Sequence, residues 1–309
     1  MTSTSAQRSI GLLLCAAGIA ASMSPGAAQQ KFRSGVDMVR VDALVTDGRT
    51  PIAGLTAADF ELRDNGVLQS IDAAAFESLP LSLIFVLDTS GSVAGGKMQH
   101  LSNAVDLILE SLHADDRAAL VTFSHRVWLR SGLMSDFSAL RRLMSSATAA
   151  GGTSLRDAVY AALAISDVEE SRPLLVVFSD GLDNSSWMDA DVVEKAARRS
   201  NAVVYGVAIG ASMKYQWSTS VSAWQPVPVY TRGQTDFLDA IADATGGRVL
   251  KADTLDKLPK TFDEVLREFR TRYVLSYSPQ RVDARGWHRI EVKVKGRNAE
   301  VKARAGYQR

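Results

Sequence analysis

The sequence has little cysteine, little histidine, and no hydrophobic run long enough to cross a membrane. Its 309 residues include one cysteine, Cys15, and four isolated histidines. A single cysteine cannot form a disulfide within the chain or build a cysteine-based zinc site. We expect the histidines to be surface or structural residues, because none has a neighbour at metal-ligand spacing. The longest apolar stretch near the N-terminus has about 12 residues, whereas a membrane span needs about 20.

Signatures of several enzyme classes are also missing. The chain has no Gly-x-Ser-x-Gly nucleophile elbow, no phosphate-binding Walker loop and no dinucleotide glycine fingerprint. Basic residues number 35 and acidic residues 34, which gives a formal net charge of +1. Such a balance produces no overall field that would attract nucleic acid or a membrane surface. We therefore expect neither as a partner.

The composition is that of a globular protein with a sizeable core. Hydrophobic residues make up 46% of the chain and charged residues 22%. The charge is uneven, because residues 260–309 contain thirteen Lys and Arg against six Asp and Glu. These basic residues alternate with apolar ones, so we interpret them as the solvated face of β-strands.

Residues 1–28 have the pattern of a secretory signal peptide. Arg8 is their only charged residue, residues 10–21 are almost wholly apolar, and small residues precede the expected cleavage after Ala28. Leu14 is large where lipoprotein signals carry Gly, Ala or Ser, so we do not expect lipid anchoring through Cys15. The chain is predicted to be exported, either to the periplasm or out of the cell.

Two flanking segments have the alternation of β-strands. Residues 29–79 form the N-terminal one, with alternation over 39–46 and a tight turn at 64–66. Residues 272–309 form the C-terminal one, with strands expected at 273–277, 290–294 and 299–303. Because the ends of a domain often lie close together, we predict that the two flanks pair in one β-sandwich.

The region between them, residues 80–271, alternates strands with helices. Strands are expected at 81–87, 118–123, 127–129, 174–178, 203–209 and 248–250. Helices are expected around 105–112, 155–165, 189–199, 237–245 and 258–270. Repeated strand–helix units predict an α/β domain with a doubly wound, mainly parallel sheet.

Polar segments follow or precede these elements at three places. Asp88-Thr89-Ser90-Gly91-Ser92 and Ser179-Asp180-Gly181 each follow an apolar strand, and Gly151-Gly152-Thr153-Ser154 opens a helix. In an open α/β sheet, ligands bind at the carboxyl ends of the strands. We therefore expect the three segments to meet at one edge of the sheet.

Their side chains suit a hard divalent cation. Ser90, Ser92 and Thr153 offer hydroxyl oxygens, and Asp88 and Asp180 offer charge, directly or through water. Mg²⁺ prefers near-octahedral oxygen ligands and keeps several waters. If both carboxylates act through water, the cation stays electrophilic and can accept a carboxylate from another protein.

This constellation resembles the metal-ion-dependent adhesion site of von Willebrand factor type A domains, over residues 81–270. The resemblance implies a Rossmann-like fold that holds Mg²⁺ or Mn²⁺. It implies that Ser90, Ser92 and Thr153 coordinate the metal, while Asp88 and Asp180 act largely through water. The flanks, at 39–47, 54–60, 273–277 and 286–288, resemble exported acidobacterial proteins of the VWFA-related type.

We predict an exported, metal-dependent protein-binding module whose cation takes an Asp or Glu from a protein partner. The alternative is a structural or assembly protein of the cell envelope, in which the metal only stabilises the fold. A metal-assisted hydrolase is less well supported, because the three segments contain no His or Glu as a general base.

One long connection, residues 211–235, is rich in aromatic residues. It is longer than the usual link of about 2–6 residues between a strand and a helix. As a loop, it could anchor a partner at the rim of the site or pack onto its own domain. Both interpretations stay open on the sequence.

Overall fold

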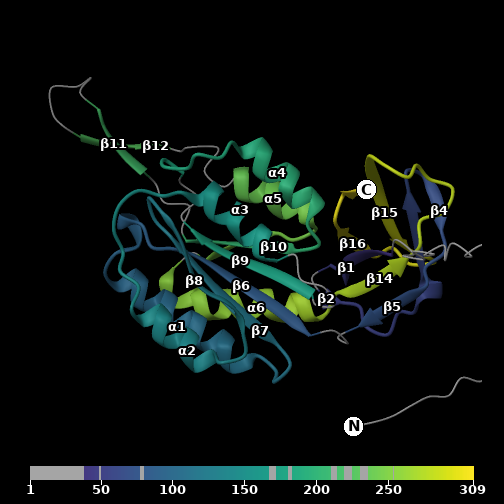
Figure 1. Ribbon diagram of the computed structural model, residues 1–309, viewed down its shortest axis with the longest axis horizontal. Helices are drawn as coiled ribbons and strands as arrows, with labels where there is room; N and C mark the ends of the chain where they lie inside the picture. Colours follow the sequence, from purple (N-terminus) through teal and green to yellow (C-terminus); the bar gives the residue numbers. More distant parts are fainter. Residues whose placement is uncertain are drawn as a thin grey trace, which may run out of the picture. The chain divides into compact units, whose positions relative to one another are not determined.

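The computed structural model describes residues 38–48, 50–76, 80–166, 172–179, 183–209, 214–218, 225–229, 236–252 and 254–309 (Figure 1). The predicted signal peptide lies outside these residues. None of the helices in the described ranges is long and apolar enough to cross a membrane.

A six-stranded sheet forms the centre of the α/β domain, in the order β13-β10-β9-β6-β7-β8. Its strands are β6 (Leu81–Asp88), β7 (Arg117–Phe123), β8 (Val127–Met134), β9 (Arg172–Ser179), β10 (Val203–Ile209) and β13 (Val249–Ala252). All neighbours are parallel except β7 and β8, which are joined by a tight turn. Every side chain of β6 and β9 is buried, as expected for central strands covered on both faces.

Helices cover both faces of this sheet (Figure 1). One face carries α1 (Gly96–Ser111), α2 (Phe137–Ser145) and α6 (Leu258–Arg270), and the other carries α3 (Leu155–Ile165), α4 (Ala190–Arg199) and α5 (Asp236–Thr245). Alternate residues of β6 supply the two cores: Phe85 packs with the first helix group and Val86 with the second. The predicted doubly wound architecture is confirmed.

The two flanks pair and form a β-sandwich. In one sheet β1 (Val39–Asp47) lies between β14 (Tyr273–Tyr277) and β16 (Glu300–Ala303), with β2 (Thr50–Pro51) and β5 (Ala73–Phe76) at its margins. The other has the order β17 (Gly306–Gln308), β15 (Trp287–Val294), β3 (Phe60–Asp64) and β4 (Val67–Gln69). Val41, Leu62 and Tyr273 are among the residues of the shared core. The predicted sandwich is confirmed.

Buried arginines connect the sandwich with the α/β domain. Arg172 at the start of β9 pairs with Asp42 of β1, 2.7 Å between Nη2 and Oδ1. Arg272 donates to the backbone oxygens of Gly246 and Lys302, and Arg304 donates to the backbone oxygen of Arg198. The interpretation of the C-terminal basic residues as a solvated face is therefore wrong for Arg272 and Arg304, which are buried because backbone carbonyls accept from their guanidinium groups.

The stretch 211–235 is not simply a loop. It contains β11 (Lys214–Ser218) and β12 (Gln225–Val229), which pair antiparallel as a separate hairpin. The aromatic residues Trp224 and Tyr230 lie outside the described part of the chain, so their predicted role stays open. Short 3₁₀ turns complete the described elements: η1 (Ala57–Asp59), η2 (Gly91–Val93) and η3 (Leu255–Lys257).

Candidate functional site

The ends of the two central strands β6 and β9 meet through their side chains. Asp88, the last residue of β6, is fully buried. Its Oδ2 accepts a hydrogen bond of 2.8 Å from the hydroxyl of Ser179, the last residue of β9. Its Oδ1 accepts a hydrogen bond of 2.8 Å from the backbone N–H of Ser90. The carboxylate orientation is thus fixed by one donor from the end of β9 and one from the loop that follows β6.

The loop after β6 brings two hydroxyls together. Thr89 anchors it, because its backbone N–H and its hydroxyl both donate to the carbonyl of Phe123, at 2.7 and 2.9 Å. The chain then turns through η2, which places Ser90 Oγ 3.1 Å from Ser92 Oγ. Ser90 is buried and Ser92 is exposed, so this hydroxyl pair leads from the interior to the surface.

Glycines bring the second loop into contact with the first. The Gly91 N–H donates to the Gly151 carbonyl at 3.0 Å. Gly151 has φ +81°, and a Cβ there would lie 2.4 Å from His125 Nδ1. A Cβ on Gly152 would lie 2.3 Å from Ser185 Oγ. Only glycine fits at these two positions without movement of the neighbours, and their close packing brings Thr153 to the site.

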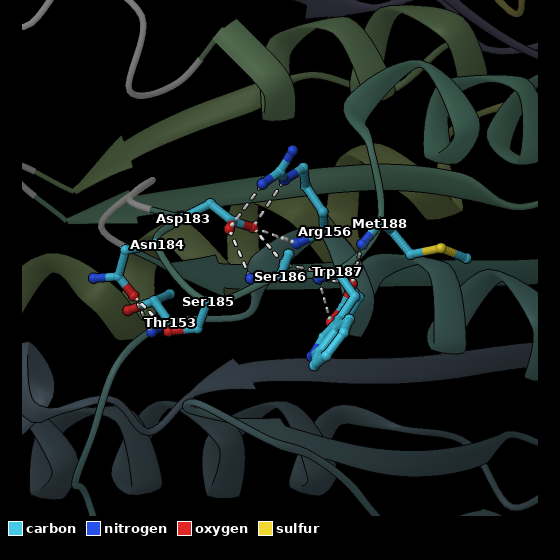
Figure 2. Close-up of polar contacts among 9 residues, drawn as sticks. Thr153, Arg156, Asp183, Asn184, Ser185, Ser186, Trp187 and Met188 are labelled. Atoms are coloured by element: carbon cyan, nitrogen blue, oxygen red, sulfur yellow. Dashed lines mark hydrogen bonds and ion pairs between the residues drawn. The ribbon is translucent and has the colours of Figure 1, made fainter.

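Thr153 is fixed through its backbone while its hydroxyl stays available. Its N–H donates to Asn184 Oδ1 at 2.8 Å, and its carbonyl accepts from the N–H groups of Asn184 and Ser185, both at 3.1 Å (Figure 2). The residue is buried. Within the described part of the chain, Thr153 Oγ1 makes no hydrogen bond. The hydroxyl oxygen of this buried residue is therefore available as a ligand for a cation.

Residues 183–188 hold the start of α3 by reciprocal capping. The Asp183 carboxylate accepts from the Arg156 N–H at 2.8 Å and from Ser186 Oγ at 2.7 Å (Figure 2). Asp157 of α3 in turn accepts from the backbone N–H groups of Trp187 and Met188. Burial alone would raise the pKa of the Asp183 carboxyl, but hydrogen bonds from Arg156 and Ser186 hold that pKa below its ordinary value. The carboxylate is therefore charged at neutral pH.

This second polar cluster was not predicted from the sequence. Its signal was the run Asp183-Asn184-Ser185-Ser186, since Asp, Asn and Ser are the residues that cap helices and close turns. The run was easy to miss because its partners, Arg156 and Asp157, lie about thirty residues earlier in the chain. The cluster fixes the backbone of Thr153 and of Trp187.

A groove of about 470 Å³ adjoins the site. Its lining includes His125, Arg126, Trp128, Ser154, Asp157 and Trp187. Ser154 follows Thr153 directly, so the groove begins at the second loop. Two of its walls are tryptophans with large exposed fractions, 94% for Trp187 and 49% for Trp128.

Four of the five predicted site residues lie in these hydrogen-bonded loops. Asp88, Ser90 and Ser92 come from the first loop and Thr153 from the second. Asp180 lies outside the described residues, although its neighbour Ser179 reaches Asp88. Nowhere in the described ranges do three His, Cys, Asp or Glu side chains gather as a metal cluster. The side chains of the four described residues offer hydroxyl and carboxylate oxygens, and this donor set fits hard Mg²⁺ or Mn²⁺ better than a soft metal.

Comparisons with known proteins show what the α/β domain is similar to. The family model described as von Willebrand factor type A domain matches residues 83–182. Mouse inter-alpha-trypsin inhibitor heavy chain H2 is 26% identical over 162 residues, which are 47% of this chain and 17% of the heavy chain. Mouse inter alpha-trypsin inhibitor heavy chain 4 is 33% identical over 140 residues, 40% of this chain and 15% of the relative. This chain therefore spans less than a fifth of the length of these relatives.

Solved structures agree on the fold. The von Willebrand factor type A structure from Catenulispora acidiphila superimposes with a TM-score of 0.52 and 14% identity, over 86% of this chain and 75% of that one. At this identity the likeness concerns the fold alone. The family model agrees with the predicted domain type over residues 83–182, and the structural neighbour agrees with the predicted fold.

Proposed function

This chain carries a von Willebrand factor type A domain, and from that premise we propose that it is an exported, metal-dependent protein-binding module. Ser90, Ser92 and Thr153 would hold Mg²⁺ or Mn²⁺ together with Asp88 and Asp180. When bound, the cation would supply an open coordination position for an Asp or Glu carboxylate of a partner protein. Domains of this family often serve in protein interaction or adhesion, which agrees with the proposal.

One observation carries this proposal. A buried carboxylate, a pair of serine hydroxyls and an uncommitted threonine hydroxyl come together in adjoining loops at one edge of the sheet. Oxygen donors that are mostly neutral leave most of the cation's charge for a further anionic ligand. A purely structural metal site would instead be closed by its own ligands, as structural zinc sites are.

A second candidate function, metal-assisted hydrolysis, is favoured by one feature. Folding places the ring of His125 beside Gly151, which brings a potential general base to the site. His125 Nδ1 lies 3.4 Å from the hydroxyl of Ser124. Turnover of ester, phosphate or peptide substrates with Mn²⁺ that His125→Ala abolishes would support the hydrolase. If no such turnover is found, binding remains the proposed function.

The proposed function is tested by capture of partners. The purified chain, immobilised in Mg²⁺, is exposed to cell-envelope extract, and the experiment is repeated in EDTA and with Asp88→Ala and Asp180→Ala. Asp47→Ala is the matched control, since it removes an exposed aspartate far along the chain from the three loops.

We expect one or more proteins to be retained only with metal, and to be lost with both site variants but not with the control. Retention that is unchanged by EDTA and by Asp88→Ala would contradict the proposal. If the metal raises the melting temperature but no retained protein depends on it, the structural alternative is correct.

A further inference from the structure

The groove beside the second loop has the features of an anchoring pocket. It starts at Ser154, next to the predicted ligand Thr153, and extends between Trp187 and the beginning of β8. The groove therefore lies within reach of a partner segment whose carboxylate bound the metal. The groove is thus positioned to contact a second residue of the same segment.

Trp187 stands on a fixed backbone although its side chain is exposed. Its N–H donates to both oxygens of the Asp157 carboxylate, at 3.1 Å each, and the Met188 N–H donates to the same carboxylate at 2.9 Å. The indole points away from the Asp183 cluster (Figure 2). An exposed aromatic on a fixed backbone loses little conformational entropy on binding, which favours an anchoring role.

Trp128, the opposite wall of the groove, is in contact with a neighbouring arginine. Trp128 lies on β8, an edge strand of the six-stranded sheet. The Arg130 guanidinium lies 5.5 Å from the centre of the Trp128 ring, and its Nε donates to the Thr122 hydroxyl at 2.8 Å. A cation held over the ring restricts the indole. The groove therefore has one aromatic wall whose ring is in contact with Arg130, and a second, Trp187, whose backbone is fixed.

The groove lining carries one carboxylate, Asp157, and one guanidinium, Arg126. The Asp157 oxygens are occupied by the backbone N–H groups of Trp187 and Met188. The Arg126 guanidinium, by contrast, is exposed and makes no ion pair or hydrogen bond within the described ranges. A ligand that is both acidic and apolar would satisfy this arrangement, since its carboxylate pairs with Arg126 and its apolar part covers the indoles.

We propose that this groove binds an aromatic or large aliphatic side chain of an acidic protein segment, with Trp187 and Trp128 as its walls and Arg126 as a second contact for carboxylates. This inference rests on the proposed function, because the same segment would supply the carboxylate for the metal. It adds a specificity rule: the partner carries an Asp or Glu with an aromatic or large aliphatic residue close by in its sequence.

The test is selection of a displayed library of random linear peptides on the purified chain in Mn²⁺. Enriched peptides are then synthesised, and their Kd values are measured by fluorescence anisotropy for the wild type, Trp187→Ala, Trp128→Ala and Asp88→Ala, and in EDTA. Leu68→Ala is the control, because Leu68 is an exposed apolar residue of β4, in the sandwich. Trp187→Ala keeps the backbone bonds to Asp157, so it should fold normally.

We expect enriched peptides to combine an acid with an aromatic or large aliphatic residue. Trp187→Ala should raise Kd at least about tenfold, as loss of a hot-spot residue does, while Mn²⁺ affinity and the Leu68→Ala Kd stay within about twofold. Enrichment of acidic peptides without such a residue, or no enrichment at all, would overturn the groove assignment. So would Trp187-dependent binding of uncharged oligosaccharides in place of peptides on a glycan array.

The design separates this proposal from the proposed function. Peptide binding that EDTA and Asp88→Ala abolish, but that Trp187→Ala leaves unchanged, refutes the groove and keeps the metal-dependent function. Binding that Trp187→Ala weakens, but that EDTA and Asp88→Ala leave unchanged, supports the groove and refutes the metal-dependent function.

Discussion

The hydroxyl of Ser179 donates a 2.8 Å hydrogen bond to the carboxylate of Asp88, although the two residues lie 91 positions apart in the sequence. This bond links the ends of β6 and β9 where the polar loops leave the sheet. Both side chains are fully buried. A buried carboxylate that loses a donor keeps its desolvation cost without the compensation, so this contact is expected to matter for folding as well as for the site.

Ser179→Ala should lower the free energy of unfolding by about 1–3 kcal/mol, because it removes a hydroxyl donor from a buried carboxylate. Urea unfolding followed by circular dichroism measures the change. Ser145→Ala is the control: this exposed serine on α2 donates only to the Arg142 carbonyl, and its loss should cost no more than about 0.5 kcal/mol. Equal effects for the two variants would show that the Asp88 contact adds nothing to stability.

Gly151→Ala should destabilise the protein by at least about 1–2 kcal/mol, since a side chain at φ +81° is strained and its Cβ would also collide with His125. The same variant should weaken Mn²⁺ binding by displacing Thr153. Gly132→Ala is the matched control, because a Cβ there meets nothing within 4 Å. Calorimetric melting curves with and without Mn²⁺ measure both effects. The account of the glycine pair is wrong if Gly151→Ala melts and binds Mn²⁺ like Gly132→Ala.

Local patterns predicted the architecture well where each element is defined by its own residues. The apolar run of β6 and the acid-to-base order of α4 identified a buried strand and a helix without reference to the rest of the chain. Strand β8 was predicted to end at Leu129 but continues to Met134. It is an edge strand with irregular pairing to β7, so exposed residues and Gly132 interrupt its alternation.

Features that depend on distant partners escaped prediction. From the sequence we placed Asp64 in a turn and considered His288 an isolated histidine. In the structure both side chains are buried, and His288 Nδ1 lies 2.7 Å from Asp64 Oδ1. The hairpin of β11 and β12 was missed because Pro226 and Pro228 argue against a strand. Alternate residues of a strand direct their backbone N–H groups to the same edge. Two prolines spaced by two can therefore both lie with the missing N–H on the edge that has no partner strand.

In the candidate site, too, local features were predicted and features that depend on distant partners were not. Asp88, Ser90, Ser92 and Thr153 were identified from residue types and their position at strand and helix ends, and the structure places them in adjoining loops. The groove between Trp128 and Trp187 was not predicted, because its two walls come from segments about sixty residues apart and meet only in the fold.

The ion pair of Arg172 and Asp42 should show strong coupling, since their side chains are only 5% and 14% exposed. Asp42→Ala leaves a buried guanidinium without its carboxylate and should cost about 3–5 kcal/mol. The double variant Asp42→Ala, Arg172→Met should recover at least half of that loss, because it removes both charges. Urea unfolding of the two single variants and the double variant completes the cycle. Additive losses would mean that the pair does not join sandwich and α/β domain energetically.

The sandwich should lose stability at alkaline pH through Tyr307, whose hydroxyl donates to Asp64 Oδ2 at 2.8 Å. Burial raises the pKa of Tyr307 to about 12, against an ordinary value of about 10. Below pH about 10 the folded and unfolded chains both keep this proton, and the stabilisation is complete. Between pH about 10 and about 12 only the unfolded chain loses it, so the free energy of unfolding falls.

Tyr307→Phe isolates this contribution. The difference in free energy of unfolding between wild type and Tyr307→Phe should be largest at pH 8–9 and should shrink as the pH passes from about 10 to about 12. Urea titrations at intervals across this range measure it. A difference that stays constant up to pH about 12 would mean that the Tyr307 pKa is not raised in the folded state.

Calorimetric titration of the purified chain with Mn²⁺ tests the central claim most directly. The account predicts one site in the wild type, competition by Mg²⁺, and binding weakened at least about tenfold in both Asp88→Ala and Thr153→Ala. At a free Mn²⁺ concentration of 100 times the wild-type Kd, the metal should raise the free energy of unfolding of the wild type by about 2.7 kcal/mol, and that of the two variants by much less. A wild type that binds no Mn²⁺, or variants that bind it as the wild type does, would contradict the account.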